Sequence, residues 1–494
     1  MSNKICNIDS GNIVNGSKLF YNTTLANWNS PLDKLEEGYE MFAYSQLGDF
    51  RTHDGEQAGP YGCYTEFASL SDGQRMFSHT SPRFHGGRVA FPSLVNGTKM
   101  FEGADLGIRE LGRGKVTMYA PKLTDGTKMF YNSNAESIYF YLASNANGVV
   151  MDEAFAYAKL GCGIEVNYAN TISSAKNMFK NADCELINLR YDGANVHTYC
   201  NCASMFEGAI LDDYVFITDQ SGYYSGGYYY GGSYNVNCLG DENFFTNLFH
   251  LWKITDASNM FKDFSASPPY SSLARFDIKE TLQCDGYCCD LKNCSKMFTN
   301  SGIFGDVTII NDLFGGETGY GFSAECMFYG SIPEDTYNHY VEIGGTAFLY
   351  CYNALGMFSQ CTGLTSFTLI GRKTLCSDFC RMALGSFPNG DSMFEGCTDL
   401  RIFETRTDNN SQIEYGYHKV SSGINCFSGC KLNNETSLRC AYHFLSECAD
   451  ATIGLDDQWA TDVDGATLLK EMFGSKRPTT VTHNGGKILR FEYN

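Results

Sequence analysis

One stretch recurs along this chain: Gly97-Thr98-Lys99-Met100-Phe101-Glu102-Gly103-Ala104. Fuller copies are Gly126-Thr127-Lys128-Met129-Phe130, Ser295-Lys296-Met297-Phe298 and Asp391-Ser392-Met393-Phe394. Shorter copies are Leu19-Phe20, Met41-Phe42, Met76-Phe77, Met178-Phe179, Met205-Phe206, Met260-Phe261, Met327-Phe328, Met357-Phe358, Cys426-Phe427 and Met472-Phe473. A segment that returns from one end of a chain to the other predicts a solenoid, in which each repeat stacks on the next.

Each repeat contains a large anchor and a small partner. Thr127 is suited to cap a short helical turn over Lys128-Met129-Phe130, in which Phe130 is the buried anchor and Met129 an adaptable filler. The anchor rings are predicted to form one buried column, including Phe101, Phe130, Phe179, Phe206, Phe298, Phe358 and Phe394. Three residues after the anchor stands a small side chain, predicted to face the neighbouring coil: Ala104, Ser133, Ala158, Ala182, Ala209, Ser301, Ser331, Cys361, Cys397 and Cys430.

Short alternating segments follow the anchors and predict strands with one buried side. They are Ile138–Tyr141, Ile187–Tyr191, Val215–Ile217, Val307–Ile309, Val341–Ile343 and Phe367–Leu369. One such unit cannot bury its apolar side alone, so stacking must build a long parallel sheet. The expected fold class is a strand-rich α/β repeat solenoid, with stacked short parallel strands and short helical turns.

Two copies carry a longer pattern, Met-Phe-x-x-Cys-x-x-Leu, at Met357–Leu364 and Met393–Leu400. This pattern resembles the BspA-like leucine-rich repeat. That family occurs in bacterial surface and secreted proteins, in some protist surface proteins and in bacteriophage structural proteins. The resemblance implies a leucine-rich-repeat-like solenoid that works through its surface.

Composition narrows the class of partner. The chain has 494 residues, too many for one compact core, and the end-to-end repeats account for that length. A formal net charge of −20 argues against nucleic acid, whose binders carry basic patches. The sequence has no apolar run long enough to span a membrane, so no membrane insertion is expected. Its first ten residues lack the apolar centre of a signal peptide, which favours a virion protein over an exported one.

The 21 cysteines are predicted to be mainly free thiols used as small buried hydrophobic groups. Their odd number and their presence in the small-residue position favour this interpretation over a disulfide framework. One dense cluster, Cys284, Cys288, Cys289 and Cys294, leaves a metal site open, although its spacing is not that of paired zinc knuckles and no histidine accompanies it. No cofactor is expected.

The repeats divide the chain into five parts. Residues 1–60 form an N-terminal cap with the first repeats, and residues 61–220 hold the most regular repeats. Residues 221–260 contain a Gly/Tyr-rich insertion. Residues 261–465 carry longer repeats with loop insertions, and residues 466–494 form a C-terminal cap with a longer helix and a terminal strand at Lys487–Tyr493.

The Gly/Tyr insertion is the predicted partner-binding site. Its glycines are expected to prevent regular structure, so that the tyrosine rings project from the repeats or, alternatively, pack back on them. The candidate residues are Tyr223, Tyr224, Tyr228, Tyr229, Tyr230 and Tyr234.

No short catalytic motif is present, whether of a zinc protease, a serine hydrolase, a phosphate-binding loop or a calcium loop. The acidic pairs Asp212-Asp213 and Asp456-Asp457 could imitate glycosidase carboxylates. Adjacent residues on a strand point to opposite faces, however, which favours solvated loop charges.

The sequence therefore predicts a non-enzymatic bacteriophage virion protein on a tail or external appendage. It would be part of a multi-copy assembly and would contact a host-surface glycan or protein, or other virion proteins. Two alternatives stay open: a BspA-like adhesin on a bacterial surface, and a polysaccharide-degrading tailspike.

Overall fold

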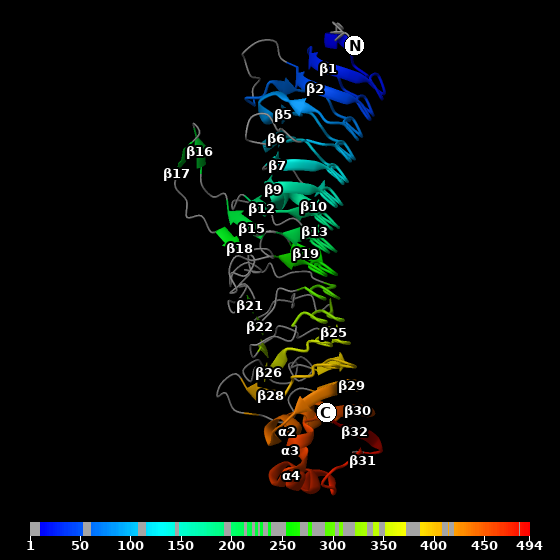
Figure 1. The fold of residues 1–494 in the computed structure, drawn as a ribbon, viewed down its shortest axis with the longest axis vertical. Helices are drawn as coiled ribbons and strands as arrows, with labels where there is room; N and C mark the ends of the chain where they lie inside the picture. The colour runs from blue at the N-terminus through cyan, green and yellow to red at the C-terminus, as the bar shows by residue number, and fades with distance from the viewer. Residues whose placement is uncertain are drawn as a thin grey trace, which may run out of the picture. The chain divides into compact units, whose positions relative to one another are not determined.

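The computed structural model describes residues 10–52, 61–106, 115–143, 148–191, 199–211, 215–219, 223–225, 228–230, 236–238, 253–266, 275–278, 292–301, 306–309, 322–332, 339–344, 351–371, 386–407, 413, 419–483 and 485–494. The chain forms two compact units. The first comprises Met1–Leu239, His250–Trp252 and Ser265–Pro269. The second comprises Gly240–Phe249, Lys253–Phe264 and Tyr270–Asn494. Each is a strand-rich parallel β-solenoid, which confirms the predicted stacking of short parallel strands (Figure 1).

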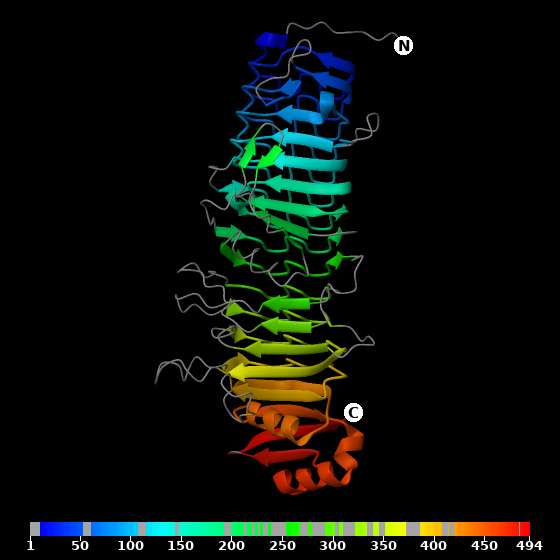
Figure 2. The same cartoon turned by 90° about the vertical axis from the view of Figure 1, so that its left-hand side faces the viewer.

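The first unit is built around a long sheet in the order β18-β15-β12-β9-β7-β6-β5-β3, whose pairs are parallel except for β15 with β18. Figure 2 shows these strands side by side. They are β3 (Thr65–Glu66), β5 (Arg88–Ala90), β6 (Lys115–Tyr119), β7 (Asn134–Tyr141), β9 (Lys159–Asn167), β12 (Ile187–Tyr191), β15 (Val215–Asp219) and β18 (Val236–Cys238). The sheet also contains β11 (Asp183–Cys184), β14 (Ile210–Leu211) and β20 (Ser265–Ala266). Smaller elements are β1 (Thr24–Asn29), β2 (Gln46–Arg51), β4 (Arg83–Phe84), β8 (Val149–Val150), β10 (Ile172–Ser174), β13 (Tyr199–Asn201) and the 3-10 turns η1 (Ser10–Asn12), η2 (His85–Gly87) and η3 (Ala169–Thr171).

The second unit repeats this design and ends in helices. A parallel sheet runs β21 (Arg275–Ile278), β22 (Asp306–Ile309), β24 (His339–Gly344), β26 (Leu364–Gly371) and β28 (Ile402–Thr407). Other strands are β19 (Lys253–Asp256), β23 (Phe322–Ser323), β25 (Cys351–Asn353), β27 (Ser386–Asn389), β29 (Lys419–Leu432), β30 (Asp450–Leu455), β31 (Thr480–His483) and β32 (Lys487–Tyr493). The helices are α2 (Glu435–Phe444), α3 (Asp457–Thr461) and α4 (Val463–Phe473). The predicted strands in both units are confirmed, as are the long C-terminal helix and the terminal strand.

The recurring Met-Phe stretch forms a corner of the coil through alternating hydrogen bonds. The N–H groups of Gly97, Lys99, Phe101 and Gly103 donate to carbonyls of the next coil, at 2.7–2.9 Å. The residues between them close successive four-residue turns within the same coil, as when the Met100 N–H donates to the Gly97 carbonyl at 3.0 Å. Each corner is therefore hydrogen-bonded both to itself and to its neighbour without forming a helix.

The predicted short helical turn is wrong at these corners. The residue before Met and the second residue after Phe have positive φ, as at Lys99 (57°) and Gly103 (64°), or at Lys128 (57°) and Asn132 (52°). A positive φ at the third residue of a four-residue turn is the geometry of a type II turn and is incompatible with a right-handed helix. The copy at Met472-Phe473 differs from the others, because both residues lie in α4, within the helix predicted there.

In most corners, a side-chain acceptor comes from the residue before the corner. The Asp125 Oδ1 accepts from the Thr127 N–H at 2.9 Å, so Thr127 is the recipient of a cap and not the predicted capping residue. Equivalent acceptors are Asn15, Asp72, Asn96, Asn201, Asp256, Asn293, Asn353 and Asn389. At Ser174 and Ser422, which replace the Asx residue, Asp152 or Asp391 of the preceding coil supplies the oxygen instead, to Lys176 or Ile424.

The anchor phenylalanines form a buried ladder in each unit. In the first unit, neighbouring rings lie nearly parallel with centroids 4.9–5.5 Å apart, in the order Phe20, Phe42, Phe77, Phe101, Phe130, Phe155, Phe179 and Phe206. In the second, the spacing is 5.0–5.9 Å, in the order Phe261, Phe298, Phe328, Phe358, Phe394 and Phe427. The predicted burial of the anchors is confirmed.

The small residues after the anchors are also buried as predicted. Serine and cysteine use this position differently. The Ser331 hydroxyl donates to the carbonyl of its own coil's anchor, Phe328, at 2.7 Å. The Cys361 thiol donates to the same Phe328 carbonyl, in the coil before its own, at 3.0 Å. Cys397 and Cys430 repeat this second arrangement, and all three thiols are free.

The last corner of the second unit is closed by a carboxylate. Gly429 occupies the position whose N–H would donate to a further coil, and it donates instead to Glu492 Oε2 at 3.0 Å. The Ser428 hydroxyl donates to the same carboxylate at 2.9 Å. Glu492 lies on β32, which pairs in parallel with β30 and antiparallel with β31. In the described part of the chain, no helix is long and apolar enough to cross a membrane.

Replacing Phe358 by Ala is expected to lower the free energy of unfolding by about 3–5 kcal/mol, because it removes a ring stacked between Phe328 and Phe394. Chemical denaturation followed by circular dichroism measures the loss. The control is Tyr352→Ala, at a side chain that is 53% exposed, with an expected change within about 0.5 kcal/mol. Equal losses in the two variants would contradict the stacked core.

Replacing Asp125 by Ala is expected to cost about 1 kcal/mol, because the Thr127 N–H loses its acceptor. Asp125→Asn keeps an oxygen in the same position and is expected to stay within about 0.5 kcal/mol of the parent protein. The same denaturation assay compares them. A loss in Asp125→Asn as large as in Asp125→Ala would show that the carboxylate charge, and not the hydrogen bond, stabilises the corner.

Alkaline pH is expected to destabilise the second unit through its buried thiols. Burial raises the pKa of Cys361 to about 11 and that of Cys351 to about 12, from an ordinary value of 9.0. Below pH 9 both thiols are protonated in the folded and unfolded chains, so their stabilising effect is complete. Between pH 9 and 11 the unfolded chain releases protons first, and the free energy of unfolding falls.

The Cys351→Ala/Cys361→Ala double variant isolates this effect when unfolding is measured with reductant from pH 7 to pH 10.5. The difference in free energy of unfolding between this variant and the parent protein at pH 7 gives the cost of the lost packing. Between pH 9 and 10.5, the free energy of unfolding is expected to fall less in the variant than in the parent protein. Parallel pH profiles would contradict the buried, protonated state of the two thiols.

Candidate functional site

The strongest candidate site lies in the first unit, where β9 changes partner. Lys159 and Leu160 pair with β11, whereas Ile164–Asn167 pair with β12. On its other side β9 pairs with β7. Leu160 and Gly163 of β9 pair with Ala135 and Ser137 of β7, so β9 has one residue more than β7 between these two pairs. This is a β-bulge, a feature that locally redirects side chains and interrupts regular pairing.

Gly163 makes the bulge possible. Its φ is +124°, a conformation that side-chain-bearing residues rarely adopt, and a Cβ there would lie 2.3 Å from the Leu186 carbonyl oxygen. That oxygen accepts the Ile164 N–H at 2.9 Å, which ties the segment after β11 against the bulge. The break between the two pairings of β9 is therefore fixed by local backbone geometry.

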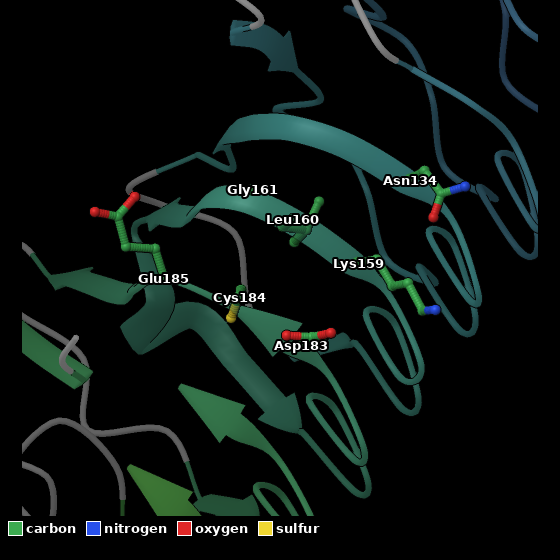
Figure 3. Close-up of a pocket in the computed structure, with 7 residues that line it drawn as sticks. All are labelled: Asn134, Lys159, Leu160, Gly161, Asp183, Cys184 and Glu185. Carbon is green, nitrogen blue, oxygen red and sulfur yellow. The ribbon is translucent and has the colours of Figure 1, made fainter. Parts of the chain in front are cut away.

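A shallow hollow of about 320 Å³ lies at this break (Figure 3). It is lined by Asn134, Lys159, Leu160, Gly161, Asp183, Cys184 and Glu185. The side chains of Leu160 and Cys184 are buried, whereas the four polar side chains are exposed. Asn134, Lys159 and Asp183 are register partners on three neighbouring strands, and Figure 3 shows Glu185 at the opposite end of the hollow.

The charged groups in the hollow are available to a ligand. Among the described residues, the Lys159 ammonium forms no salt bridge, although Asp183 is its register partner. The Cys162 thiol lies on the bulge, 3.9 Å from Glu136 Oε1. Desolvation, followed by the Glu136 and Glu185 carboxylates, raises its pKa, so this thiol is protonated at neutral pH and is a poor nucleophile.

A second polar and aromatic area continues along the same strands. On β7, Tyr139 and Tyr141 alternate with buried Ile138 and Phe140, and both face outward. Tyr139 is the register partner of Glu165 on β9, which is in turn the partner of Asn188 on β12. We call the outward side of these three strands, together with the hollow, the β7–β9–β12 face.

Contacts within the β7–β9–β12 face hold its side chains in place. Glu165 Oε1 forms an ion pair with Arg190 at 2.8 Å and accepts from the Asn167 amide at 3.1 Å. The Tyr141 ring stacks on Tyr119 of β6, with centroids 4.9 Å apart and planes at 19°. The face thus offers tyrosine rings beside side chains that donate hydrogen bonds and side chains that accept them.

The sequence analysis placed the site elsewhere, in the Gly/Tyr insertion. Its expectation that glycine prevents regular structure is wrong, because β16 (Tyr223–Ser225) and β17 (Tyr228–Tyr230) pair as an antiparallel hairpin. The hairpin is a separate two-stranded sheet and does not join the long sheet. The side chains of Tyr223, Tyr224, Tyr228, Tyr229 and Tyr230 and the whole of Tyr234 lie outside the described residues, so their predicted role in binding stays a prediction.

The candidate metal and glycosidase residues are only partly described. Cys284, Cys288 and Cys289 lie outside the described residues, and the buried Cys294 thiol donates to the Ser323 carbonyl at 3.1 Å. Asp212 and Asp213 are likewise not described. Asp456 caps α3 by accepting the Trp459 N–H, and Asp457 forms an ion pair with Arg477 at 2.6 Å. No cluster of metal-ligating residues is found within the described ranges.

The residues of the hollow were missed by the sequence analysis. Their signal is the segment Lys159-Leu160-Gly161-Cys162-Gly163, where two glycines interrupt a strand. Interior glycines in a strand indicate a bulge. No known protein family, curated protein or solved structure matches this chain.

Proposed function

We propose that this protein is a non-catalytic binding protein of a bacteriophage virion, located on the tail or on an external appendage. It attaches the particle to a host surface or contacts neighbouring virion proteins. The observation that carries the binding function is the β7–β9–β12 face, where three neighbouring strands present tyrosine, amide, carboxylate and ammonium groups in register. Large, pre-ordered faces of stacked repeats are how repeat proteins bind extended partners.

Rigidity supports a binding role for this face. Parallel pairing sets the spacing between neighbouring strands, and the ion pair of Glu165 with Arg190 and the stacking of Tyr141 on Tyr119 restrict side-chain motion. A partner that binds such a surface loses little free energy to ordering the protein.

The virion setting and the leucine-rich-repeat type are supported by the sequence resemblance. The Met-Phe-x-x-Cys-x-x-Leu pattern at Met357–Leu364 and Met393–Leu400 resembles that of BspA-like repeats. Its cysteines, Cys361 and Cys397, are buried free thiols in equivalent positions of successive coils. An adhesin on a bacterial surface is the alternative from the same resemblance.

A non-catalytic role is supported by the state of the candidate groups. Burial raises the pKa values of Cys361, Cys397 and Cys426, so these thiols stay protonated at neutral pH. Asp456 and Asp457 are engaged in a helix cap and an ion pair, which does not suit a pair of glycosidase carboxylates.

Mass spectrometry of purified virions, produced by cells that carry the gene, tests the proposal. The expected result is several copies of the chain per particle, together with binding of the purified protein to host cells. Absence from the particles, with the chain found instead on protease-treated bacterial surfaces, would favour the adhesin. A fall in polysaccharide viscosity on incubation with the purified protein would favour a depolymerising tailspike.

A further inference from the structure

We infer that the β7–β9–β12 face binds a neutral glycan chain, with the hollow as its main hydrogen-bonding subsite. This inference rests on the proposed binding function and adds the chemical class of the ligand. It is built on three observations: the balance of charge in the hollow, the hydrogen-bonding capacity of its side chains, and the aromatic rings further along the same strands.

The charges in the hollow disfavour both kinds of ion. Asp183 and Glu185 line it, with Glu136 near its Cys162 side, so its carboxylates outnumber its single ammonium, and the whole chain carries a net charge of −20. An anionic polymer would be repelled. A divalent cation needs several oxygen ligands that converge on one point, whereas the strand register places the Lys159 ammonium between Asn134 and Asp183, and the described residues contain no cluster of metal-ligating side chains.

A neutral polyhydroxylated ligand fits the same groups. Each sugar hydroxyl both donates and accepts, so it can donate to the Asp183 or Glu185 carboxylate and accept from the Lys159 ammonium. The Asn134 amide offers a donor and an acceptor beside them. Hydrogen bonds to ionised groups are stronger than those between neutral groups, which allows a shallow site to hold an uncharged ligand.

The aromatic rings extend the site from one sugar to a chain. Tyr139 and Tyr141 lie on the same strand as Asn134, and five residues of extended strand span roughly 17 Å. That length suits an oligosaccharide and exceeds a single sugar. Ring faces provide apolar contact area, and phenolic hydroxyls add hydrogen bonds at the edge. The stacking of Tyr141 on Tyr119 fixes one of these rings before a ligand arrives.

Isothermal titration calorimetry with neutral oligosaccharides tests the inference on the full chain. The probes are hexamers of β-linked glucose, α-linked glucose and N-acetylglucosamine, compared with hyaluronan fragments and with calcium ions. The expected result is binding of at least one neutral hexamer, and no binding of the anionic polymer or of calcium. Binding confined to hyaluronan or to calcium would overturn the inference, as would failure of all three neutral hexamers.

Matched variants locate the bound glycan. Asn134→Ala/Asp183→Ala removes hydrogen-bonding groups, and Tyr141→Ala removes the stacked ring. Each is expected to weaken binding by at least tenfold, whereas Tyr141→Phe retains most of it. Lys122→Gln and Glu36→Gln, which change exposed charges outside the face, are the controls and are expected to bind like the parent protein. Thermal unfolding of every variant verifies that it is folded.

The outcomes separate this inference from the proposed function. If the chain is found in virions and binds host cells equally well with and without the face variants, the glycan site is refuted and the virion role stands. If a neutral glycan binds at this face but the chain is absent from virions, the ligand class stands and the virion role is refuted.

Discussion

The structure depends on the hydrogen bonds that each corner donates to the next coil. Four alternate N–H groups, such as those of Gly97, Lys99, Phe101 and Gly103, donate in one direction, and the turns between them are closed within the coil. This arrangement forces two residues per corner into the left-handed region, at about 1–2 kcal/mol for each residue other than glycine. The hydrogen bonds return about 0.5–1.5 kcal/mol each, and full burial of one anchor phenylalanine adds about 1.5–3 kcal/mol. Stacking therefore offsets the strain only when a neighbouring coil is present.

This constraint explains which residues the corners use. Asn, Gly and Asp tolerate positive φ best, and they occupy many of the second left-handed positions, as at Gly103, Asn132 and Asn181. The Asx acceptor before the corner orders the turn at its start. At two corners Asp152 or Asp391 of the preceding coil provides this oxygen instead, so the acceptor can come from either of two coils.

The solenoid could be predicted because its signal is repeated and apolar. Met-Phe pairs mark the ladder of rings, and alternating segments mark strands, of which Ile187–Tyr191 has the predicted bounds and the others are longer than predicted. The corner was misread as helical because Thr-Lys-Met-Phe has ordinary helix formers, and only contact with a neighbouring coil makes Lys99 and Lys128 left-handed. The β7–β9–β12 face was missed for a related reason. Its residues come from strands about 25 positions apart in sequence, and only the pairing of Lys159 with Asn134 and Asp183 brings them together.

The carboxylate of Glu492 satisfies a donor that the last corner of the second unit would otherwise leave open. A stack of identical coils has no intrinsic end, because every coil leaves a row of N–H donors ready for one more. At Gly429 that donor is already bonded to a side chain, and the Cys430 carbonyl accepts from the Asn494 amide. This corner thus offers neither of these groups to a second molecule. A stack of self-complementary layers remains a discrete particle, and not the seed of a fibre, where its own chain occupies the groups that a further layer would use.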